Sequence, residues 1–488
     1  MTKSYGVHWF RRDLRVAGNP GLQASWKKHE GRVVGVFCFD KKFLARPDFS
    51  QNRFAFFLET LVALKAEMQA LGSDLLVLDT GPHESFTELL GAIKSHDLPM
   101  PTTFSFNRDY EPFARARDHE IERLLRGQFG LEVEHERDHL LLEPHEISKP
   151  DHSPYQVYTP FSKVWMKKFE TEEVQARVKT QNKGLSYLKS CIEGEKVERK
   201  FKLSWSDIFK NKIEFKDVLE TYRKKNQTGL KISLPPAGSV NALKHLSQFK
   251  GDRLAHYDTA RDIPGIPGTS QVSIFLKNGS LTTSQIIAYL SLKPGKYLNE
   301  LIWREFYYHI LHHFPSVETE TFQRKYAKIK WENDEKLFSA WCAGKTGYPL
   351  VDAGMRQLNE TGWMHNRVRM VVASFLMKDC LIDYRWGEKY FMEKLLDGDL
   401  APNNGGWQWA ASTGCDAQPY FRIFNPVSQS ERFDPAGDYI RKWVPELAHL
   451  SAKEIHKPWE SSRLGQYVKP IVEHSVQSKR AIALFKSA

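Results

Sequence analysis

The stretch 362–408 holds the residues whose types and spacing best suit chemistry. Within the segment 363–370, helical spacing places Asn366, Arg369 and Met370 on one face of a helix. An amide, a guanidinium and a thioether together differ from a packed core face, so we expect them to meet a polar ligand. Local capping or pairing of these side chains is the alternative interpretation.

Two carboxylates follow on the same stretch. Asp397 and Asp399 flank Gly398, and the segment 403–409 continues as Asn-Asn-Gly-Gly-Trp-Gln-Trp. A metal site is disfavoured, because no histidine or third carboxylate stands near them at metal-ligand spacing. Since an unpaired half-buried carboxylate is costly, we expect both acids to accept hydrogen bonds from a planar polar group or to pair with Arg369.

Two further segments could bind parts of a nucleotide. The residues 268–273 follow a loop rich in proline and glycine, and their N–H groups and hydroxyls at a helix start could cradle a phosphate. An ordinary N-cap is the more common explanation of such a segment. Glu300, Trp303 and Arg304 are spaced as neighbours on a helix. An acid beside a tryptophan suits the recognition of a flipped base, although a surface helix with one buried tryptophan has the same pattern.

Several common catalytic motifs are missing from the sequence. The chain contains no G-x-S-x-G elbow and no GxxxxGK[ST] loop, which disfavours hydrolases of that type and nucleoside triphosphatases. The turn after the first expected strand reads Arg11-Arg12-Asp13-Leu14-Arg15 instead of GxGxxG. This turn disfavours a dinucleotide-binding Rossmann site.

The first 140 residues alternate short apolar runs with longer helical patterns. The expected strands are 6–10, 33–39, 75–78 and 103–106, and the expected helices include 52–71 and 115–125. The apolar runs are too continuous for a sheet with one wet face, which favours parallel strands covered on both faces. We therefore predict an α/β doubly wound parallel-sheet domain over 1–140.

The remainder of the chain is expected to be helical. Residues 141–210 carry four spaced prolines and mixed charge, which predicts a long irregular connector on the surface. From 211 to 447 the helical period dominates, and the segment after 447 gives no clear pattern. The second domain, 211–488, should be all-α.

The composition is basic and rich in aromatic residues. The 488 residues include 70 Lys and Arg against 59 Asp and Glu, a formal net charge of +11, together with 13 Trp, 18 Tyr and 30 Phe. This balance favours nucleic acid as a partner, bound through phosphates and stacking. A membrane span is disfavoured, because the mean hydropathy is −0.50 and no apolar run approaches the ~18 residues of a spanning helix.

The cysteines and the first residues of the chain indicate in which cellular compartment the protein works. Five scattered cysteines, never in CxxC, argue against a disulfide framework and a zinc site and favour a reducing compartment. The first residues show no apolar signal-peptide core. We expect a cytoplasmic protein that associates with the nucleoid through DNA and works as a monomer, with no membrane partner.

Taken together, these stretches resemble the photolyase/cryptochrome family over almost the whole chain, most nearly the class I cyclobutane pyrimidine dimer photolyases. The resemblance is carried by WFRRDLR at 9–15, by WREF at 303–306, by the blocks 347–370 and 397–409, and by FRIFNP at 421–426. It implies an N-terminal antenna domain and a C-terminal FAD-binding domain. The implied activity is light-dependent repair of UV-damaged DNA, in which excited FADH⁻ lends an electron to a flipped dimer.

The resemblance assigns the cofactor site residue by residue. It implies that the FAD phosphates and ribose are bound by Tyr257, Thr269, Ser270, Gln271, Val272 and Ser273. Arg369 and Asp397 would pair across the isoalloxazine, and Arg304 and Asp399 would also bind the cofactor. Asn403 would face flavin N5, where its amide can accept the N5–H. A carboxylic acid there is typical of plant cryptochromes, so Asn403 favours repair.

The resemblance also assigns the substrate contacts. The pocket for the dimer would be formed by Glu300, Trp303, Asn366, Met370 and Trp409, and the DNA contacts by Arg261 and Gln429. Glu300 would hydrogen-bond the dimer and stabilise its anion. The alternatives are a DASH-type cryptochrome and a blue-light photoreceptor.

An electron-transfer chain to the flavin would run through Trp407 (inner) and Trp331 (outer). The middle position holds Tyr384, with Trp386 two residues further on. Because tyrosine is harder to oxidise without losing its proton, we expect impaired photoactivation or a route through Trp386, with repair intact. Alternatively, Tyr384 is only a core aromatic.

The antenna chromophore is the last expectation. Folate-binding members of the family carry an Asn-Glu pair where this chain has Phe113 and Ala114, which disfavours methenyltetrahydrofolate. The segment 107–112 looks more like the deazaflavin-type members.

Overall fold

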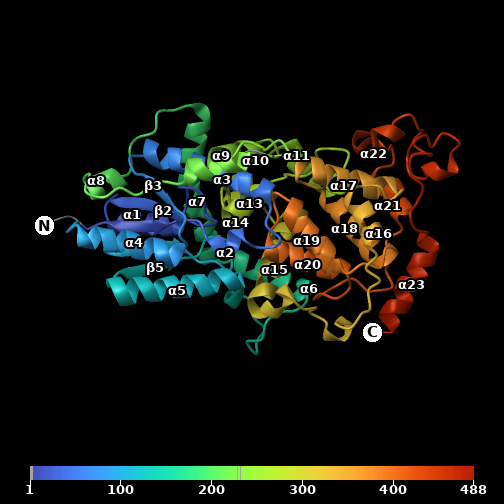
Figure 1. Cartoon of the computed structure of the whole chain (residues 1–488), viewed down its shortest axis with the longest axis horizontal. Coiled ribbons are helices and arrows are strands. Elements are labelled where there is room, and N and C mark those ends of the chain that lie inside the picture. Colours follow the sequence, from blue (N-terminus) through green and yellow to red (C-terminus); the bar gives the residue numbers. More distant parts are fainter. Residues whose placement is uncertain (1–3, 228, 231, 488) are drawn as a thin grey trace.

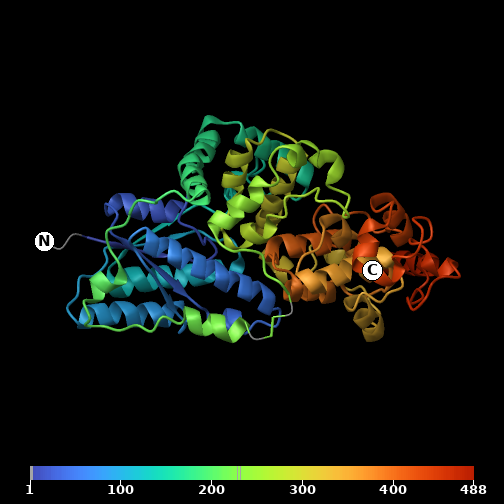
Figure 2. The same ribbon diagram turned by 90° about the horizontal axis from the view of Figure 1, so that it is seen from above.

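The computed structural model describes residues 4–227, 229–230 and 232–487. An α/β domain lies at one end of the molecule and a helical domain at the other (Figure 1). The view from above shows the same division, with the sheet on the left and the last helices on the right (Figure 2).

The N-terminal sheet has five parallel strands in the order β3-β2-β1-β4-β5. The strands are β1 (Gly6–Trp9), β2 (Val33–Cys38), β3 (Leu75–Leu78), β4 (Thr103–Asn107) and β5 (Glu132–Glu136). The helices around them are α1 (Pro20–Lys28), α2 (Lys41–Leu44), α3 (Gln51–Ala70), α4 (Pro82–Ser95) and α5 (Pro112–Phe129). The doubly wound parallel sheet is thereby confirmed, and β5 is an addition. Its sequence Glu-Val-Glu-His-Glu has one apolar residue, because an edge strand is only partly covered.

Both faces of the sheet are buried, which explains the continuous apolar runs. In β2, Val34 and Val36 pack in a core with residues of α4 and α5, whereas Val33 and Phe37 pack in a core with residues of α1 and α3. Alternate side chains point to opposite faces of a strand, so a strand covered on both sides must be apolar throughout.

The segment 141–210 differs from the irregular connector expected there. It contains α6 (Tyr158–Phe169), α7 (Glu172–Glu193) and the short α8 (Trp205–Phe209). Trp165 on α6 is fully buried in a core shared with the helical domain, and α7 packs along α10 (Ser239–Ser247) and α14 (Thr283–Leu290). Pro160 lies in the first turn of α6, where its missing N–H costs no helical hydrogen bond.

The helical domain is confirmed, and its remaining elements follow in chain order. They are α9 (Leu219–Gln227), α11 (Asp252–Ala255), α12 (Tyr257–Ala260), α13 (Ser273–Asn278), α15 (Lys296–His313), α16 (Glu335–Cys342), α17 (Pro349–Thr361), α18 (Asn366–Ser374), α19 (Tyr384–Lys394), α20 (Leu400–Ala410), α21 (Pro426–Phe433), α22 (Asp438–Trp443) and α23 (His474–Lys486). Short 3-10 turns occur at Pro144–Glu146, Pro315–Glu318, Arg324–Tyr326, Pro445–Leu447 and Pro458–Glu460. Helix α20 packs against α15, α18 and α19 and is the centre of the domain. Among the described residues, no helix has the length and apolar character needed to span a membrane.

Glu305 on α15 fixes the chain that links the two domains. Its carboxylate accepts hydrogen bonds from the backbone N–H of Leu141 (2.5 Å) and of Leu142 (3.2 Å), and from the indole N–H of Trp165 (2.6 Å). All three donors converge on one buried acid, so the linking segment, α6 and α15 hold one arrangement.

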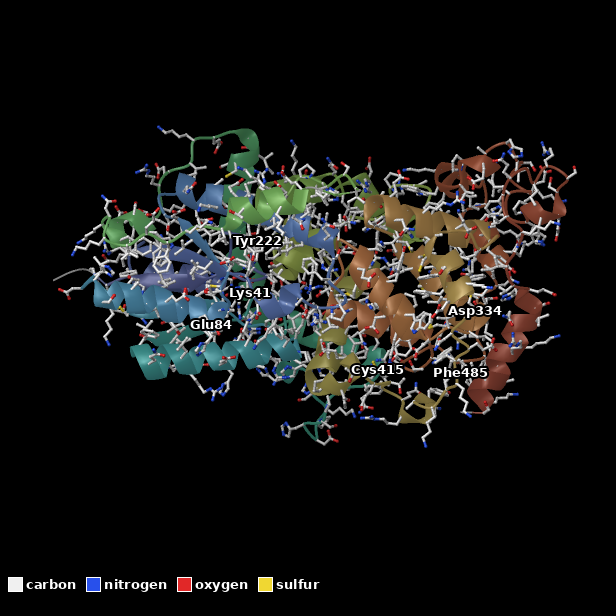
Figure 3. The ribbon with its side chains drawn as sticks, viewed as in Figure 1. Lys41, Glu84, Tyr222, Asp334, Cys415 and Phe485 are labelled. Carbon is white, nitrogen blue, oxygen red and sulfur yellow. The ribbon has the colours of Figure 1, made fainter. Side chains whose placement is uncertain are left out.

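The last helix, α23, covers a buried lysine on a π-helical turn, Phe375–Asp379. The fully buried Lys378 contacts Ser412 Oγ through its Nζ (3.3 Å), and this Nζ lies 3.5 Å from the ring centroid of Phe485 on α23. Figure 3 labels Phe485, whose ring also lies 5.8 Å from the ring of Trp331. A second contact holds the start of α23, where His474 Nδ1 lies 2.6 Å from Asp379 Oδ1. Helix α23 therefore lies over both the buried amine and Trp331.

Replacing Lys378 by Met should change how the stability of the protein depends on pH. Burial lowers the pKa of Lys378 from 10.5 to about 7, so between these values the unfolded chain binds one proton more than the folded chain. The wild-type free energy of unfolding therefore gains up to about 1.4 kcal/mol per pH unit from this residue above pH ~7, and nothing below it. The advantage of Lys378→Met should be largest at pH ~6–7 and should shrink towards pH ~9.

Urea unfolding of both proteins across this range measures the effect. The exposed Lys389 provides the control, because Lys389→Met makes the same change of side chain at a site in contact with water. A Lys378→Met difference that does not change with pH would show that Lys378 does not titrate in this range.

Candidate active site

The predicted ion pair between Arg369 and Asp397 is present. Arg369 Nη2 donates to Asp397 Oδ2 (2.8 Å) and Oδ1 (3.1 Å), and Arg369 Nε donates to the carbonyl of Met364 (2.9 Å). Asp397 is buried and Arg369 is half-buried. Helix α18 presents the guanidinium from its first turns, after His365 has capped the helix through Arg367 N–H. The planar guanidinium and the carboxylate together offer hydrogen-bonding groups to a planar ligand, and Arg369 neutralises the charge of Asp397.

Helices α19 and α20 orient the amide of Asn403. Asn403 Nδ2 donates to the backbone carbonyl of Glu388 (3.1 Å), and the neighbouring Asn404 Nδ2 donates to Glu388 Oε1 (3.0 Å). Because the amide nitrogen is engaged, Asn403 Oδ1 is the atom left to a ligand, and it can accept an N–H. This arrangement fits the flavin N5–H that the sequence assigned to this residue.

The segment 267–270 is held through its carbonyl groups. Arg253 donates to the carbonyls of Pro267 and Thr269 (both 2.8 Å). His245 Nε2 contacts the carbonyl of Ser270 (2.9 Å). Within the described residues, the N–H groups of 269–273 donate no hydrogen bond to the protein. A loop fixed by its carbonyls, with its amides free, fits an anion such as a phosphate.

Three further features complete this loop. Gln271 adopts a φ of 53°, an unusual backbone conformation for a residue with a side chain. A Cβ on Gly268 would lie 2.3 Å from the carbonyl oxygen of Ala260, so only glycine allows the loop to pass there. Tyr297 donates to Ser270 Oγ (2.8 Å) and packs edge-on against Tyr257, which brings Tyr257 to the loop. Val272 is buried and Ser273 begins α13, so the segment expected to hold the cofactor phosphates lies together.

Asp399 lies at the junction between the two domains. Its Oδ1 accepts hydrogen bonds from Arg12 Nη2 (3.0 Å), Lys277 Nζ (2.9 Å) and Tyr308 OH (2.7 Å). Burial opposes ionisation of this carboxyl, but attraction to Arg12 and Lys277 outweighs it and holds the pKa of Asp399 well below its ordinary value. The predicted contact of Asp399 with the cofactor stays a prediction beside these protein contacts.

Arg304 also points to the junction. Its guanidinium contacts the imidazole of His139 (2.9 Å) and lies 5.0 Å from the ring centroid of Tyr308. Sequence reasoning missed Arg12 and Lys277 as partners of this region. The only available signal was the charged turn after the first strand.

Of the predicted lesion-binding residues, Glu300 and Met370 contact one cluster of ion pairs, which lies where α15, α18 and the segment 261–262 meet. Arg261 Nη1 lies 2.7 Å from Glu300 Oε1 on α15, and Arg367 Nη2 lies 2.8 Å from Asp262 Oδ1. Arg367 also contacts Met370 Sδ (3.6 Å). Trp303, Met370 and Trp409 are half-buried, Asn366 is exposed, and Gln429 is half-buried on α21.

Tyr158 is a member of this group that sequence reasoning missed. Its ring stacks on Trp303 at a centroid distance of 3.6 Å and an interplanar angle of 5°. Its hydroxyl donates to the carbonyl of Asn299 (3.0 Å). The residue was overlooked because it lies in the segment expected to be an irregular connector. One face of the Trp303 indole is therefore covered by the protein.

The buried Trp407 contacts a second tryptophan. A Cβ on Gly387 would lie 2.2 Å from Trp407 Cη2, so α19 lies directly against this indole. Trp407 meets Trp341 edge-on at 6.2 Å between ring centroids. From Trp341 the aromatic contacts continue to Phe338 (5.9 Å) and from there to Trp386 (5.1 Å). Trp341, which no motif marked, thus connects the inner tryptophan with Trp386.

The surroundings of Tyr384 disfavour its oxidation. It is fully buried, and this burial raises its pKa well above the ordinary value for tyrosine. The Arg385 guanidinium lies 4.9 Å from its ring and disfavours a positive charge on it. These surroundings support the expectation that Tyr384 is an obstacle on the route from Trp331 to Trp407.

Comparisons with known proteins agree with this geometry. Residues 6–179 match a family model described as DNA photolyase, and residues 297–487 match one described as the FAD binding domain of DNA photolyase. Two curated relatives are named deoxyribodipyrimidine photo-lyase: one from Escherichia coli, 36% identical with 98% of both chains covered, and one from Vibrio cholerae, 37% identical with 98% of this chain and 99% of the relative covered.

Two solved structures have the same fold. A bacterial class III photolyase from Agrobacterium tumefaciens superposes with a TM-score of 0.79 and 32% identity, covering 100% of this chain and 98% of that one. An archaeal photolyase from Sulfolobus tokodaii, solved with two FAD molecules, also gives a TM-score of 0.79, with 29% identity over 99% of this chain and 100% of that one.

Replacing Trp341 by Phe should slow light-driven reduction of a bound flavin at least several-fold. Phenylalanine keeps an apolar ring at this buried position, although it gives up the hydrogen bond to the Val372 carbonyl, and it is too hard to oxidise to relay an electron. Tyr384→Phe, its matched control, should change the rate little. Flavin absorbance under blue light with an external reductant measures both. If Tyr384→Phe stops the reduction and Trp341→Phe does not, the route runs through Tyr384.

Proposed function

The chain belongs to the DNA photolyase family, and on this premise we propose that it is a light-dependent lyase that repairs cyclobutane pyrimidine dimers in UV-damaged DNA. Two observations together support the proposal: the amide of Asn403 is oriented by Glu388, and Arg369 pairs with Asp397. This combination fits the ring of reduced FAD. At the position of Asn403, plant cryptochromes typically carry a carboxylic acid instead.

The residues of the chain bind and orient the cofactor. The free amides of 269–273 would hold the phosphates, and the Arg369–Asp397 pair would hydrogen-bond the edge of the isoalloxazine. Asn403 Oδ1 would accept the N5–H and thereby keep the ring reduced. When bound, the reduced flavin supplies the electron that opens the cyclobutane ring after it absorbs light.

The lesion is recognised by one aromatic face and one acid. The open face of Trp303 would stack the flipped bases, a contact worth about 1–3 kcal/mol per base, and Glu300 would accept a hydrogen bond from a base edge. Flipping a base costs a few kcal/mol, and less for a dimer that is already poorly stacked. Met370 and Trp409 would close the sides of the pocket, and Arg261 and Gln429 would contact the strand.

We favour as the antenna site a cavity of about 170 Å³ that residues of the N-terminal domain line together with Ile274, Lys277 and Asn278 of the helical domain. It lies beyond the carboxyl ends of β1 and β4, where the strand order reverses and ligands commonly bind. Its aromatic lining includes Phe37, Phe39, Phe49, Phe54, Phe57 and Phe113. These rings support a flat polycyclic chromophore, and we favour a deazaflavin-type one over methenyltetrahydrofolate. The Sulfolobus tokodaii structure carries a second FAD, so a flavin is the other candidate.

The cellular setting belongs to the same proposal. All five cysteines are unpaired, which fits a reducing compartment such as the cytoplasm. The enzyme would act as a monomer on DNA of the nucleoid, with no membrane partner.

A repair assay tests the proposed activity. The purified, reduced protein should remove thymine dimers from a duplex oligonucleotide under blue light and should remove none in the dark. Trp303→Ala should lose most of the repair while keeping the FAD absorbance, because the stacking face is gone. If the illuminated protein binds the duplex without removing dimers, the photoreceptor alternative is correct. Repair confined to single strands would identify a DASH-type enzyme.

Filling the antenna cavity should remove the second chromophore alone. Ala114 lines the cavity from α5, so Ala114→Phe should abolish the absorption band of the antenna while one FAD per chain remains. Gly127→Ala on the same helix points into open space and is the control. Absorption spectra of proteins purified from cells that make deazaflavin measure both. A folate spectrum in the wild type would contradict the deazaflavin assignment.

A further inference from the structure

Two ion pairs cross the rim of the lesion site, both made by the adjacent residues Arg261 and Asp262. Arg261 lies 2.7 Å from Glu300 on α15, and Asp262 lies 2.8 Å from Arg367 on α18. The segment 261–262 therefore connects the two helices that carry Trp303 and Met370.

In the two ion pairs, the charged groups that would bind a DNA strand are already bound to one another. Arg261 would bind a phosphate and Glu300 would bind a base, yet each neutralises the other. The side chains remain within reach of a ligand, since 19% of Arg261 and 33% of Glu300 are exposed. An ion pair that water still reaches is weak enough to be exchanged.

Aromatic rings support both guanidinium groups. The Arg261 guanidinium lies 5.4 Å from the ring centroid of Tyr257, and that of Arg367 lies 4.5 Å from the ring centroid of Phe433. Such contacts hold a cation in place. If the carboxylate partners leave, both arginines keep their positions at the rim and face the approaching strand.

We propose that the Arg261–Glu300 and Asp262–Arg367 pairs form an electrostatic guard that lowers the affinity for DNA, and that the Arg261–Glu300 pair makes this guard selective against undamaged DNA. The proposal rests on the function proposed above. A phosphate competes with Glu300 for the Arg261 guanidinium, and an intact duplex offers the displaced carboxylate no partner. Damaged DNA offers one, because the flipped base presents its N–H to Glu300. Specificity then arises from a penalty on the wrong ligand as well as from contacts to the right one.

The guard acts at both arginines, because each would leave an acid without a partner when it binds a phosphate. Stranding Glu300 beside a phosphate places two negative charges together in a half-buried site, which costs free energy. The same holds for Asp262 when a phosphate takes Arg367. The acids beside the two arginines thus lower the affinity for ordinary DNA. This matters because the many undamaged sites around a lesion compete with it for the protein.

Removing the acid should therefore strengthen binding to undamaged DNA. With Glu300→Gln and with Glu300→Ala, we expect the affinity for an undamaged duplex to rise about 3- to 10-fold. The slope of log K against log salt should steepen by about one, because one more arginine meets a phosphate. Asp262→Asn should act in the same direction, and Arg261→Ala combined with Glu300→Gln should return to the wild-type value.

The matched control is Glu59→Gln, which makes the same change in net charge. Glu59 on α3 pairs with Arg223 at 2.8 Å and is exposed to a similar extent as Glu300, but it lies in the N-terminal domain. Titration of fluorescent duplexes with and without a thymine dimer, at several salt concentrations, measures all variants.

The outcomes separate the guard from the proposed function. If Glu300→Gln and Glu300→Ala bind undamaged duplex within twofold of Glu59→Gln, the guard is wrong, while a wild type that prefers and repairs dimer DNA keeps its function. If the wild type neither prefers nor repairs dimer DNA, the proposed function fails, whatever the variants do.

Discussion

The buried carboxylate of Asp399 holds the two domains in one arrangement. Arg12 reaches it from the turn after β1, Lys277 from α13 and Tyr308 from α15, so three separate segments meet on one charge. Removing Asp399 would leave Arg12 and Lys277 without the buried acid that they share, which is strongly destabilising. Because α20 begins at the next residue, Leu400, this cluster also sets the position of the helix that carries Asn403 and Trp407.

The same cluster forms part of the antenna cavity. Arg12 and Lys277 line that cavity together with Glu111, which accepts a hydrogen bond from Arg12 at 2.7 Å. The turn after β1 therefore lines the proposed antenna cavity and also reaches the acid that precedes α20. The charged turn that argued against a dinucleotide site is explained by this use, since a glycine-rich turn could not reach Asp399.

The sequence allowed the fold to be predicted wherever burial imposes a period. The parallel strands and α3 were predicted from apolar spacing alone, because both faces of the sheet are covered. The edge strand β5 and the helices α6 and α7 were not predicted. Their partial exposure and mixed charge interrupt the regular spacing of apolar residues on which the prediction depends. In the site, the pairing of Arg369 with Asp397 could be predicted, because a buried acid needs a partner. The contacts of Tyr158 with Trp303 and of Trp341 with Trp407 join distant segments, which no local pattern marks.

The stack of Tyr158 on Trp303 limits how this indole can contact DNA. Tyr158 covers one face of the ring, so a base can stack only on the other face. A side chain that wedges between neighbouring base pairs needs both of its faces free. Trp303 therefore cannot enter an intact stack of bases, and it can receive only a base that has already left the stack.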